Sequence, residues 1–342
     1  SENQKRRLIS VVAALVSAAL SLLAQTQGEQ RDSLLRLISA SYIEQAEQGD
    51  DFVRKAVDAT FLHNGTYLIA DSSVWSQSTN IINCMGHVRM LQGDTELTSD
   101  KLDYLVDQDL AQFRGALVQL RDKQDNMLRT RVLDYNTKDS VAVFRGGASM
   151  RSSDGQIIES DEGHYFNARN LFSFEGSVNM YTDSVFVRAD SLHYLSDVNK
   201  AVFVSPIDFW KDDNMLSAGG GWYSRPDNIF FFSGDVRGLT RDQESWSDTL
   251  FFYRSNNDVL MRGHVQIQDS TRSTAAVSDY LFYKDTLSKV TLRDNAAVAL
   301  WSEDEEGQID TTYFGADTLI YNTIRRCDIQ EAEVTAAAER LK

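Results

Sequence analysis

The sequence has few cysteines, few prolines and no surplus of positive charge. Only two of its 342 residues are cysteine and two are proline, and no stretch rich in proline, serine or glycine marks a linker. The net charge of −16 excludes the basic footprint that nucleic acid binding needs. It also excludes docking on anionic headgroups by overall charge, so an anionic lipid would have to be held by its apolar part. The two thiols, Cys84 and Cys327, are far apart in the chain, and we predict that both are buried and unpaired.

Long apolar runs are also scarce, and the one present is at the N-terminus. Lys5, Arg6 and Arg7 precede an apolar run from Leu8 to Ala24, which is typical of an export signal. We expect residues 1–24 to be either a signal peptide removed after Ala24 or an uncleaved membrane anchor. No cysteine follows the run at once, which argues against a lipoprotein. Residues 25–37 then form a polar or helical lead-in.

Two short sequence blocks alternate through the rest of the chain. The first block is seen in Ala189–Tyr194, and its second residue, the Asp position, recurs mostly every 29 to 31 residues. The second block is seen in Phe174–Val178, and its third residue, the Gly position, keeps the same period. The Asp positions are Asp71, Asp100, Arg131, Asp161, Asp190, Gly219, Asp248, Asp279 and Asp317. The Gly positions are Gly86, Gly115, Gly146, Gly176, Ser205, Gly234, Gly263 and Asp294. Such a period indicates a repeat architecture.

Apolar residues within each block have a period of two, which is the period of a β-strand. Four residues after every Asp position stands an aromatic residue: Trp75, Tyr104, Tyr135, Tyr165, Tyr194, Tyr223, Phe252, Tyr283 and Tyr321. Apolar residues also recur two before and two after the Gly position. Before the Asp position the apolar residues are at odd offsets and after it at even ones, so the buried face changes there and a bulge or corner is expected.

The pattern predicts two long bent strands per repeat, each crossing two facing sheets. Turns such as Asp107–Asp109 and Asn136–Asp139 join the strands. We expect the repeat array to span residues 38–325, with a first copy over 38–66 in which the repeat pattern is degenerate. The tail over 326–342 is expected to become helical from Glu331. One interior copy is irregular, because Ser205-Pro206 replaces the Gly position and three glycines follow at 219–221. We predict a local bend or opening near 205–226.

The repeated blocks resemble the OstA-like family of Gram-negative lipopolysaccharide transport. Ser99–Tyr104 with Phe113–Gly115, and Ala189–Tyr194, carry the resemblance best, and it covers about residues 40–325. It implies an all-β fold, an elongated twisted β-jellyroll of about nine ~30-residue two-strand repeats with an open apolar groove. It also implies a periplasmic protein that carries lipopolysaccharide acyl chains and stacks with other bridge proteins, or with itself, between the inner and outer membranes.

The residues expected to contact acyl chains are the two ladders around the Gly position. They are Phe113, Phe144, Phe174, Phe203, Phe232, Val88, Ala148, Val178, Ile207, Val236 and Val265. The aromatic residues after the Asp position are expected mainly to fill the core. Either use of these ladders removes apolar surface from water, which is favourable by ~0.8 kcal/mol per methylene.

No pattern predicts catalysis, a cofactor or a metal. The Asp ladder could bind calcium, but calcium-binding β-rolls use short glycine-rich repeats, so corner hydrogen bonding is the better reading. His87, His164, His193 and His264 are expected on the surface, where none meets a second ligand. Two alternatives to lipid transport stay open. The first is a structural or adhesive β-repeat protein that polymerises without lipid cargo. The second, which fits the repeat length less well, is a polysaccharide-cleaving parallel β-helix.

Overall fold

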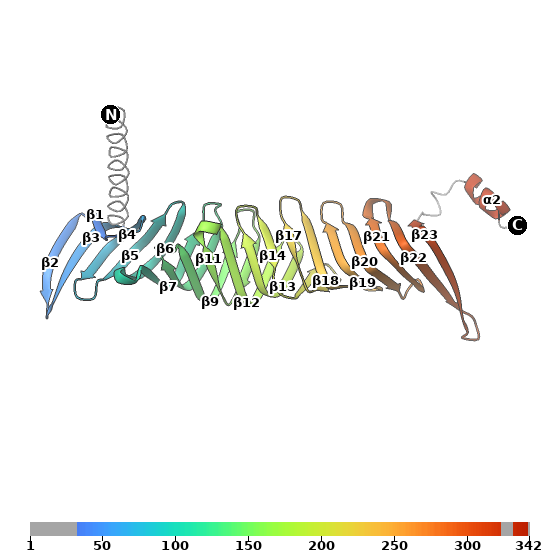
Figure 1. The fold of residues 1–342 in the computed structure, drawn as a ribbon, viewed down its shortest axis with the longest axis horizontal. Helices are drawn as coiled ribbons and strands as arrows, with labels where there is room; N and C mark the ends of the chain where they lie inside the picture. The colour runs from blue at the N-terminus through green and yellow to red at the C-terminus, as the bar shows by residue number, and fades with distance from the viewer. Residues whose placement is uncertain (1–32, 323–330, 341–342) are drawn as a thin grey trace, which may run out of the picture. The chain divides into compact units, whose positions relative to one another are not determined.

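The computed structural model describes residues 33–322 and 331–340 and is built almost wholly from antiparallel strands (Figure 1). This confirms the all-β prediction. The expected signal or anchor and Cys327 lie outside the described residues. Among the helices of the described part, none is long and apolar enough to cross a membrane. The chain divides into unit 1, Ser1–Gly155 with Ser160–Leu171, and unit 2, Gln156–Glu159 with Phe172–Lys342.

Unit 1 is a succession of antiparallel hairpins in which most strands pair with their neighbours in sequence. β9 pairs with β11 in the same antiparallel manner. Its strands are β1 (Arg36–Ser39), β2 (Tyr42–Gln48), β3 (Asp51–His63), β4 (Thr66–Ser76), β5 (Ile81–Gln92), β6 (Thr95–Leu105), β7 (Leu110–Arg121), β8 (Met127–Asn136), β9 (Val141–Arg151) and β11 (Glu162–Phe166). Short 3-10 helices η1 (Val106–Gln108) and η2 (Asn167–Arg169) form two of its turns.

Unit 2 continues the same pairing scheme. Its strands are β10 (Ile157–Ser160), β12 (Leu171–Thr182), β13 (Val185–Leu195), β14 (Lys200–Phe203), β15 (Ile207–Lys211), β16 (Asn214–Ala218), β17 (Gly220–Ser224), β18 (Ile229–Leu239), β19 (Gln243–Tyr253), β20 (Asp258–Asp269), β21 (Thr274–Lys284), β22 (Lys289–Glu303) and β23 (Ile309–Asn322). The 3-10 helix η3 (Asp285–Leu287) forms one turn, and the helix α2 (Glu331–Arg340) ends the described chain.

The corner predicted from the change of phase is a β-bulge. Between β5 and β6 the register passes from Met85↔Lys101 to Val88↔Ser99, so β5 advances by three residues where β6 advances by two. On β6 the buried residues are Thr95, Leu97 and Ser99 before the corner and Leu102 and Tyr104 after it. The buried face therefore changes at the Asp position, as predicted.

The bulge needs a left-handed backbone at two successive residues. At the first such corner Gly86 has φ 81° and His87 has φ 42°. The same pair of positive φ angles recurs at Gly146–Gly147, Gly176–Ser177, Gly234–Asp235, Gly263–His264 and Asp294–Asn295. Glycine adopts this conformation without strain, and Asn and Asp tolerate it better than other residues. This requirement explains why the second block is marked by glycine.

The irregular copy interrupts both of its strands, so the ladder there is not continuous, and the local bend or opening near 205–226 stays a prediction. β14 ends at Phe203 and β15 begins at Ile207, and the next strand is broken between β16 and β17 at Gly219. The glycines serve close approach of two backbones. At Gly221 (φ +152°) an added Cβ would lie 2.0 Å from the carbonyl oxygen of Phe231. Only a residue without a side chain fits against β18 at this point.

We predict that Gly221→Ala lowers the free energy of unfolding by roughly 3 kcal/mol or more, because overlap with a backbone carbonyl adds to the cost of a Cβ at positive φ. The control is Gly307→Ala in the β22–β23 turn of the same unit. Gly307 has φ +79° and meets only a flexible Glu303 side chain at 3.5 Å, so its loss should be about 1–2 kcal/mol. Urea denaturation followed by circular dichroism measures both. Equal losses would contradict the close-approach argument.

Candidate functional site

The residues expected to contact acyl chains are all buried in the structure. The exposed fraction is 0% for Phe113, Phe144 and Phe174 and reaches its maximum, 9%, at Ala148. The remaining members are equally enclosed: Phe203, Phe232, Val88, Val178, Ile207, Val236 and Val265. The two ladders therefore fill the interior of each unit, and in this conformation the side chains contact one another.

The two ladders differ in how tightly they fill the interior. Around the phenylalanine ladder, ring centroids are 5.8 Å apart for Phe230 and Phe232 and 5.2 Å apart for Phe209 and Phe232. The ladder after the Gly position instead has small residues beside it on the paired strands. Its cross-strand partners include Val88↔Ser99, Val236↔Ser247 and Val265↔Ser278. We call these valines with their serine partners the Val–Ser track.

The Val–Ser track contains buried hydroxyls that lack partners. Ser247 and Ser278 are each 4% exposed, and their Oγ atoms make no hydrogen bond. An unpaired buried hydroxyl costs about 1–3 kcal/mol. The track is consequently the least well satisfied part of the interior in unit 2. It is also the part where the least apolar area is lost if the facing strands separate.

The aromatic residues after the Asp position do more than fill the core. Tyr194 and Tyr223 donate their hydroxyls to the side-chain oxygens of Asn199 and Asn228, at 2.8 and 3.2 Å. Each asparagine lies five residues later, at a turn position with positive φ. The ring is thus buried while its polar end ties down the turn. Burial accordingly raises the pKa of Tyr165 to about 12.

The Asp position closes the bulge with a hydrogen bond to the residue after the Gly position. Asp71 accepts from His87 Nδ1 at 2.6 Å, Asp248 from His264 Nδ1 at 2.9 Å, and Asp279 from Asn295 Nδ2 at 2.7 Å. These contacts confirm the predicted corner role for three of the seven carboxylates of the Asp ladder. They also explain the glycine again, because an added Cβ at position 263 would lie 2.2 Å from Asp248 Oδ2.

Both corner histidines are exposed, as predicted, with side-chain exposures of 90% for His87 and 84% for His264. The hydrogen bond and then the charge of Asp71 raise the pKa of His87 above its usual value, and Asp248 acts in the same way on His264. A surface cavity of about 360 Å³ adjoins the first corner and is lined by His87, Arg89, Asp100 and Leu117 among others.

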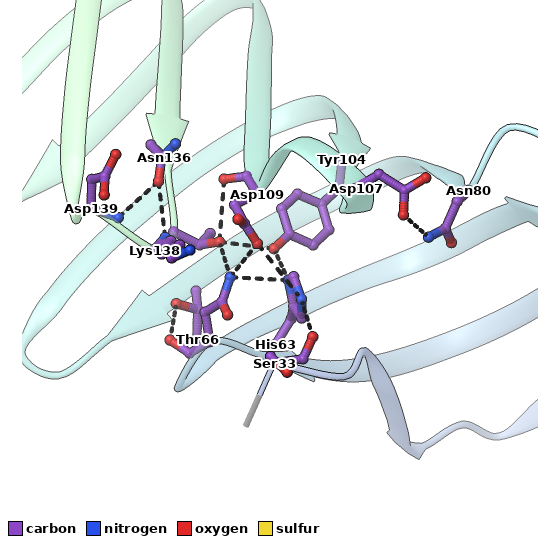
Figure 2. A network of polar contacts seen from close by, with 12 residues as sticks. Ser33, His63, Thr66, Asn80, Tyr104, Asp107, Asp109, Asn136, Lys138 and Asp139 are labelled. Atoms are coloured by element: carbon purple, nitrogen blue, oxygen red, sulfur yellow. Dashed lines mark hydrogen bonds and ion pairs between the residues drawn. The ribbon is translucent and has the colours of Figure 1, made fainter. Parts of the chain in front are cut away.

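A buried polar network in unit 1 was not predicted from the sequence (Figure 2). His63 is 4% exposed, and its Nε2 lies 3.0 Å from the carbonyl oxygen of Ser33. Nε2 must carry the proton to make this bond, so Nδ1 accepts the hydroxyl of Tyr104. Tyr104 also bonds to Thr137 Oγ1 at 2.9 Å. The network ties the start of the described chain to β3, β6 and the turn after β8.

Asn64 links this network to the next turn, donating to Asp109 at 2.7 Å and to Thr137 at 3.0 Å. Every member has a partner among the described residues, which is the arrangement of a structural network rather than of a reactive site. The sequence signal was the isolated position of His63, which lies outside both repeated blocks.

The predicted buried thiol is confirmed at Cys84, where burial raises the pKa to about 12. A thiol with such a pKa is unreactive at neutral pH. Within the described residues no group of three or more His, Cys, Asp or Glu side chains is arranged to hold a metal ion. The Asp residues are instead spaced one per repeat along the chain.

Part of the chain matches a known protein family. Residues 34–190 match the family described as OstA-like protein. Over these residues the chain is similar to OstA-like proteins. The family resemblance of the repeated blocks is thereby confirmed. The comparison with curated proteins gives no match.

Two solved structures show weaker likeness to this chain. One is LptH, described as the LptA homologous periplasmic component of the conserved lipopolysaccharide transport device from Pseudomonas aeruginosa. It is 14% identical, with 43% of this chain and 94% of that chain covered and a TM-score of 0.23. The other is the WD40 domain of SCAP from fission yeast, 8% identical, with 85% and 91% covered and a TM-score of 0.14. With such TM-scores neither likeness carries an argument here.

The corner histidines lead to a pH prediction. Because the folded-state pKa of His87 and His264 is raised, their contribution to stability is complete below about pH 6.5 and is lost as pH rises through the raised value. We expect the double variant His87→Gln/His264→Gln to melt below the parent at pH 5.5, and the difference to shrink towards pH 8.5. Thermal melts across this range measure it.

The control for this prediction is Asn295→Ala, which removes the equivalent, non-titrating bond to Asp279. Its effect on the melting temperature should not change over the same range. A constant difference for the histidine variant would show that the corner bonds do not depend on imidazole charge.

Proposed function

We propose that this OstA-like chain is a periplasmic lipopolysaccharide transport protein in a bridge to the outer membrane. Its fold is a twisted β-jellyroll of about nine repeats, its cargo the acyl chains of lipopolysaccharide, and it has no enzymatic activity. The family match over residues 34–190 supports this function. The single structural observation that carries the proposal is the recurrence of buried apolar ladders from repeat to repeat.

Uniform ladders suit a cargo that slides. Each methylene of an acyl chain gains ~0.8 kcal/mol on leaving water, so a chain held in the interior is strongly retained. Movement along the interior then requires that neighbouring sites differ little in free energy. The ladder after the Gly position meets this need because apolar residues of small or medium size recur in it beside small cross-strand partners, as at Val236 with Ser247 and Val265 with Ser278.

Because the ladders are closed, we propose that acyl chains enter between the two facing layers along the Val–Ser track and leave the hydrogen-bonded strands of each layer paired. Lifting the opposite layer off valine and serine exposes less apolar area than lifting it off stacked phenylalanines, at ~25 cal/mol per Å². The unpaired hydroxyls of Ser247 and Ser278 lose no hydrogen bond when the track opens. The phenylalanine ladder and the tyrosine-tied turns would stay packed and preserve the fold.

We further propose that partners join by edge-strand pairing, either other bridge proteins or a second copy. β23 pairs with β22, and its apolar side chains are exposed, 68% at Ile309 and 77% at Tyr313. An exposed strand edge with apolar side chains is a template for another strand.

The same edge favours one alternative, a structural or adhesive protein that polymerises without cargo. The closed interior fits this alternative as well, because a protein without cargo needs only a packed core. Detection of lipid inside the ladders separates the two functions.

We predict that an aliphatic diazirine side chain at Val178 or at Val236 crosslinks to lipopolysaccharide in Gram-negative cells expressing the chain. The matched controls are the next residues, Asn179 and Arg237, which alternate to the outer face and should give no adduct. Adducts are measured by gel shift with an antibody against lipopolysaccharide. Absence of adducts at all positions along the ladder would reject transport and leave polymerisation as the better function.

A further inference from the structure

One row of side chains on the outer face of unit 2 is apolar where an outer face should be polar. It crosses β14 and β17 to β21 through successive cross-strand pairs (Figure 1). We call it the outer apolar row, and its members are Val202, Trp222, Phe231, Phe251, Leu260 and Phe282. The chain neighbours of its members point into the core: Phe230 is 0% and Phe232 1% exposed. Strand alternation therefore places the row on the outer face, where its members are half-buried apart from Leu260, which is buried at 8% exposed.

The equivalent row in unit 1 is polar. The row in unit 1 consists of the residues three after each Asp position and three before each Gly position. These residues are cross-strand partners on neighbouring strands. Its members are Asn83, Asp103, Gln112, Asp134, Val143 and His164. Since both rows occupy the same place in the same repeat, the fold itself does not demand apolar residues there. The outer apolar row needs another explanation.

The outer apolar row is long and narrow. Six strands at ~4.8 Å spacing give it a length of about 24 Å, and its width is one side chain, roughly 7 Å. Polar Ser224 and Ser233 border it on neighbouring positions of the same face, whereas the paired Ile229 and Tyr253 widen it at its middle. Its area is on the order of 170 Å², far below the ~800 Å² that each partner of a stable protein complex buries. A single extended acyl chain fits this shape, whereas a protein surface does not.

Cations gather where the outer apolar row ends. On β22 the row position is Thr291, with Lys289 and Arg293 two residues away on either side of it on the same face. Lys284 lies directly opposite Lys289, and like charges at directly opposed positions of a sheet repel. None of these three side chains forms an ion pair with a described residue. A bound anion between them would remove the repulsion.

The neighbouring carboxylates are engaged elsewhere. Asp258 accepts the backbone N–H of Asp285 at 3.0 Å, and Asp285 accepts the hydroxyl of Tyr283 at 3.0 Å. Arg293 lies over the ring of Tyr280 at 3.9 Å, which holds its guanidinium beside the row. Asp258 and Asp285 keep their negative charge in these bonds, so the three cations leave a surplus of one positive charge at this end of the row, although the net charge of the chain is −16.

We propose that the outer apolar row binds a monoacyl phospholipid. The acyl chain lies along the aromatic side chains, and the phosphate lies at Thr291 between Lys289, Arg293 and Lys284. A phosphate monoester carries about −1.5 to −2 charges and accepts charge-assisted hydrogen bonds from such groups. The site is on the opposite face of the sheet from the Val–Ser track, so it does not depend on the transport function proposed above.

The test uses palmitoyl lysophosphatidic acid, below its critical micelle concentration, titrated into the full chain by calorimetry. Phe231→Thr/Phe251→Thr should weaken binding at least tenfold, because it removes the two central rings and keeps residues that favour strands. Val143→Thr, at the matched position in unit 1, should leave the affinity unchanged. Thermal melts establish that each variant is folded.

A second arm tests the headgroup. Lys289→Gln/Arg293→Gln changes side chains at the surface, and it should weaken lysophosphatidic acid at least tenfold without affecting the weaker binding of zwitterionic lysophosphatidylcholine. If the phenylalanine variant fails to fold, the binding of lysophosphatidic acid to the Lys289→Gln/Arg293→Gln variant still tests the proposal. Failure of the parent to bind, or equal affinity in parent and folded variants, overturns the proposal. So does a concentration-dependent dimer that the phenylalanine variant abolishes, because the occupant would then be a second copy.

Discussion

The structure depends on one constraint, the change of buried face within a single strand. A strand buries alternate side chains on one side, so a strand that must contribute to two facing layers needs a defined corner. Here the corner consists of two successive residues with positive φ, as at Gly263 and His264, closed by a carboxylate from the neighbouring strand, Asp248. The corner therefore restricts the backbone conformation, the room for a side chain and the hydrogen-bond partner at the same residues. Where Asp and Asn replace glycine, at positions 294 and 295, their tolerance of positive φ preserves the corner.

The corner divides the interior of each repeat into parts of different character. On one side, phenylalanines pack closely, and the tyrosines bind the turns through their hydroxyls. On the other side, valine and alanine face small residues, and the hydroxyls of Ser247 and Ser278 are unpaired. The interior thus has a well satisfied part that maintains the fold and a part where fewer interactions oppose separation. A carrier of apolar chains needs both properties, because the fold must survive while the cargo space opens.

The repeats share an interior but not an exterior. At one register position the outer face carries carboxylates and amides in unit 1 and aromatic rings in unit 2, for instance Asp103 against Phe251. Packing constrains only the buried positions, so the outer positions are free to acquire separate roles. The local cluster of Lys284, Lys289 and Arg293 also shows that a strongly acidic chain can present a positive site. The net charge of a protein acts on a ligand that approaches from a distance, whereas the charged side chains within a few ångströms of a site determine whether the ligand binds there.

The sequence alone determined the strand class, the repeat, the position of the face change and the interruption after Ser205. Each of these follows from local rules: a period of two, the conformational freedom of glycine and the missing donor of proline. It also indicated the buried ladders around Phe174 and Val178, since regularly spaced apolar residues must share one side of a strand. Only the tertiary structure decided that these ladders are closed, that His63 bonds Tyr104 across 41 residues, and that the tyrosines reach the turn asparagines. Such contacts depend on which strands face each other and how closely, and that is set by packing over distances that no local pattern records.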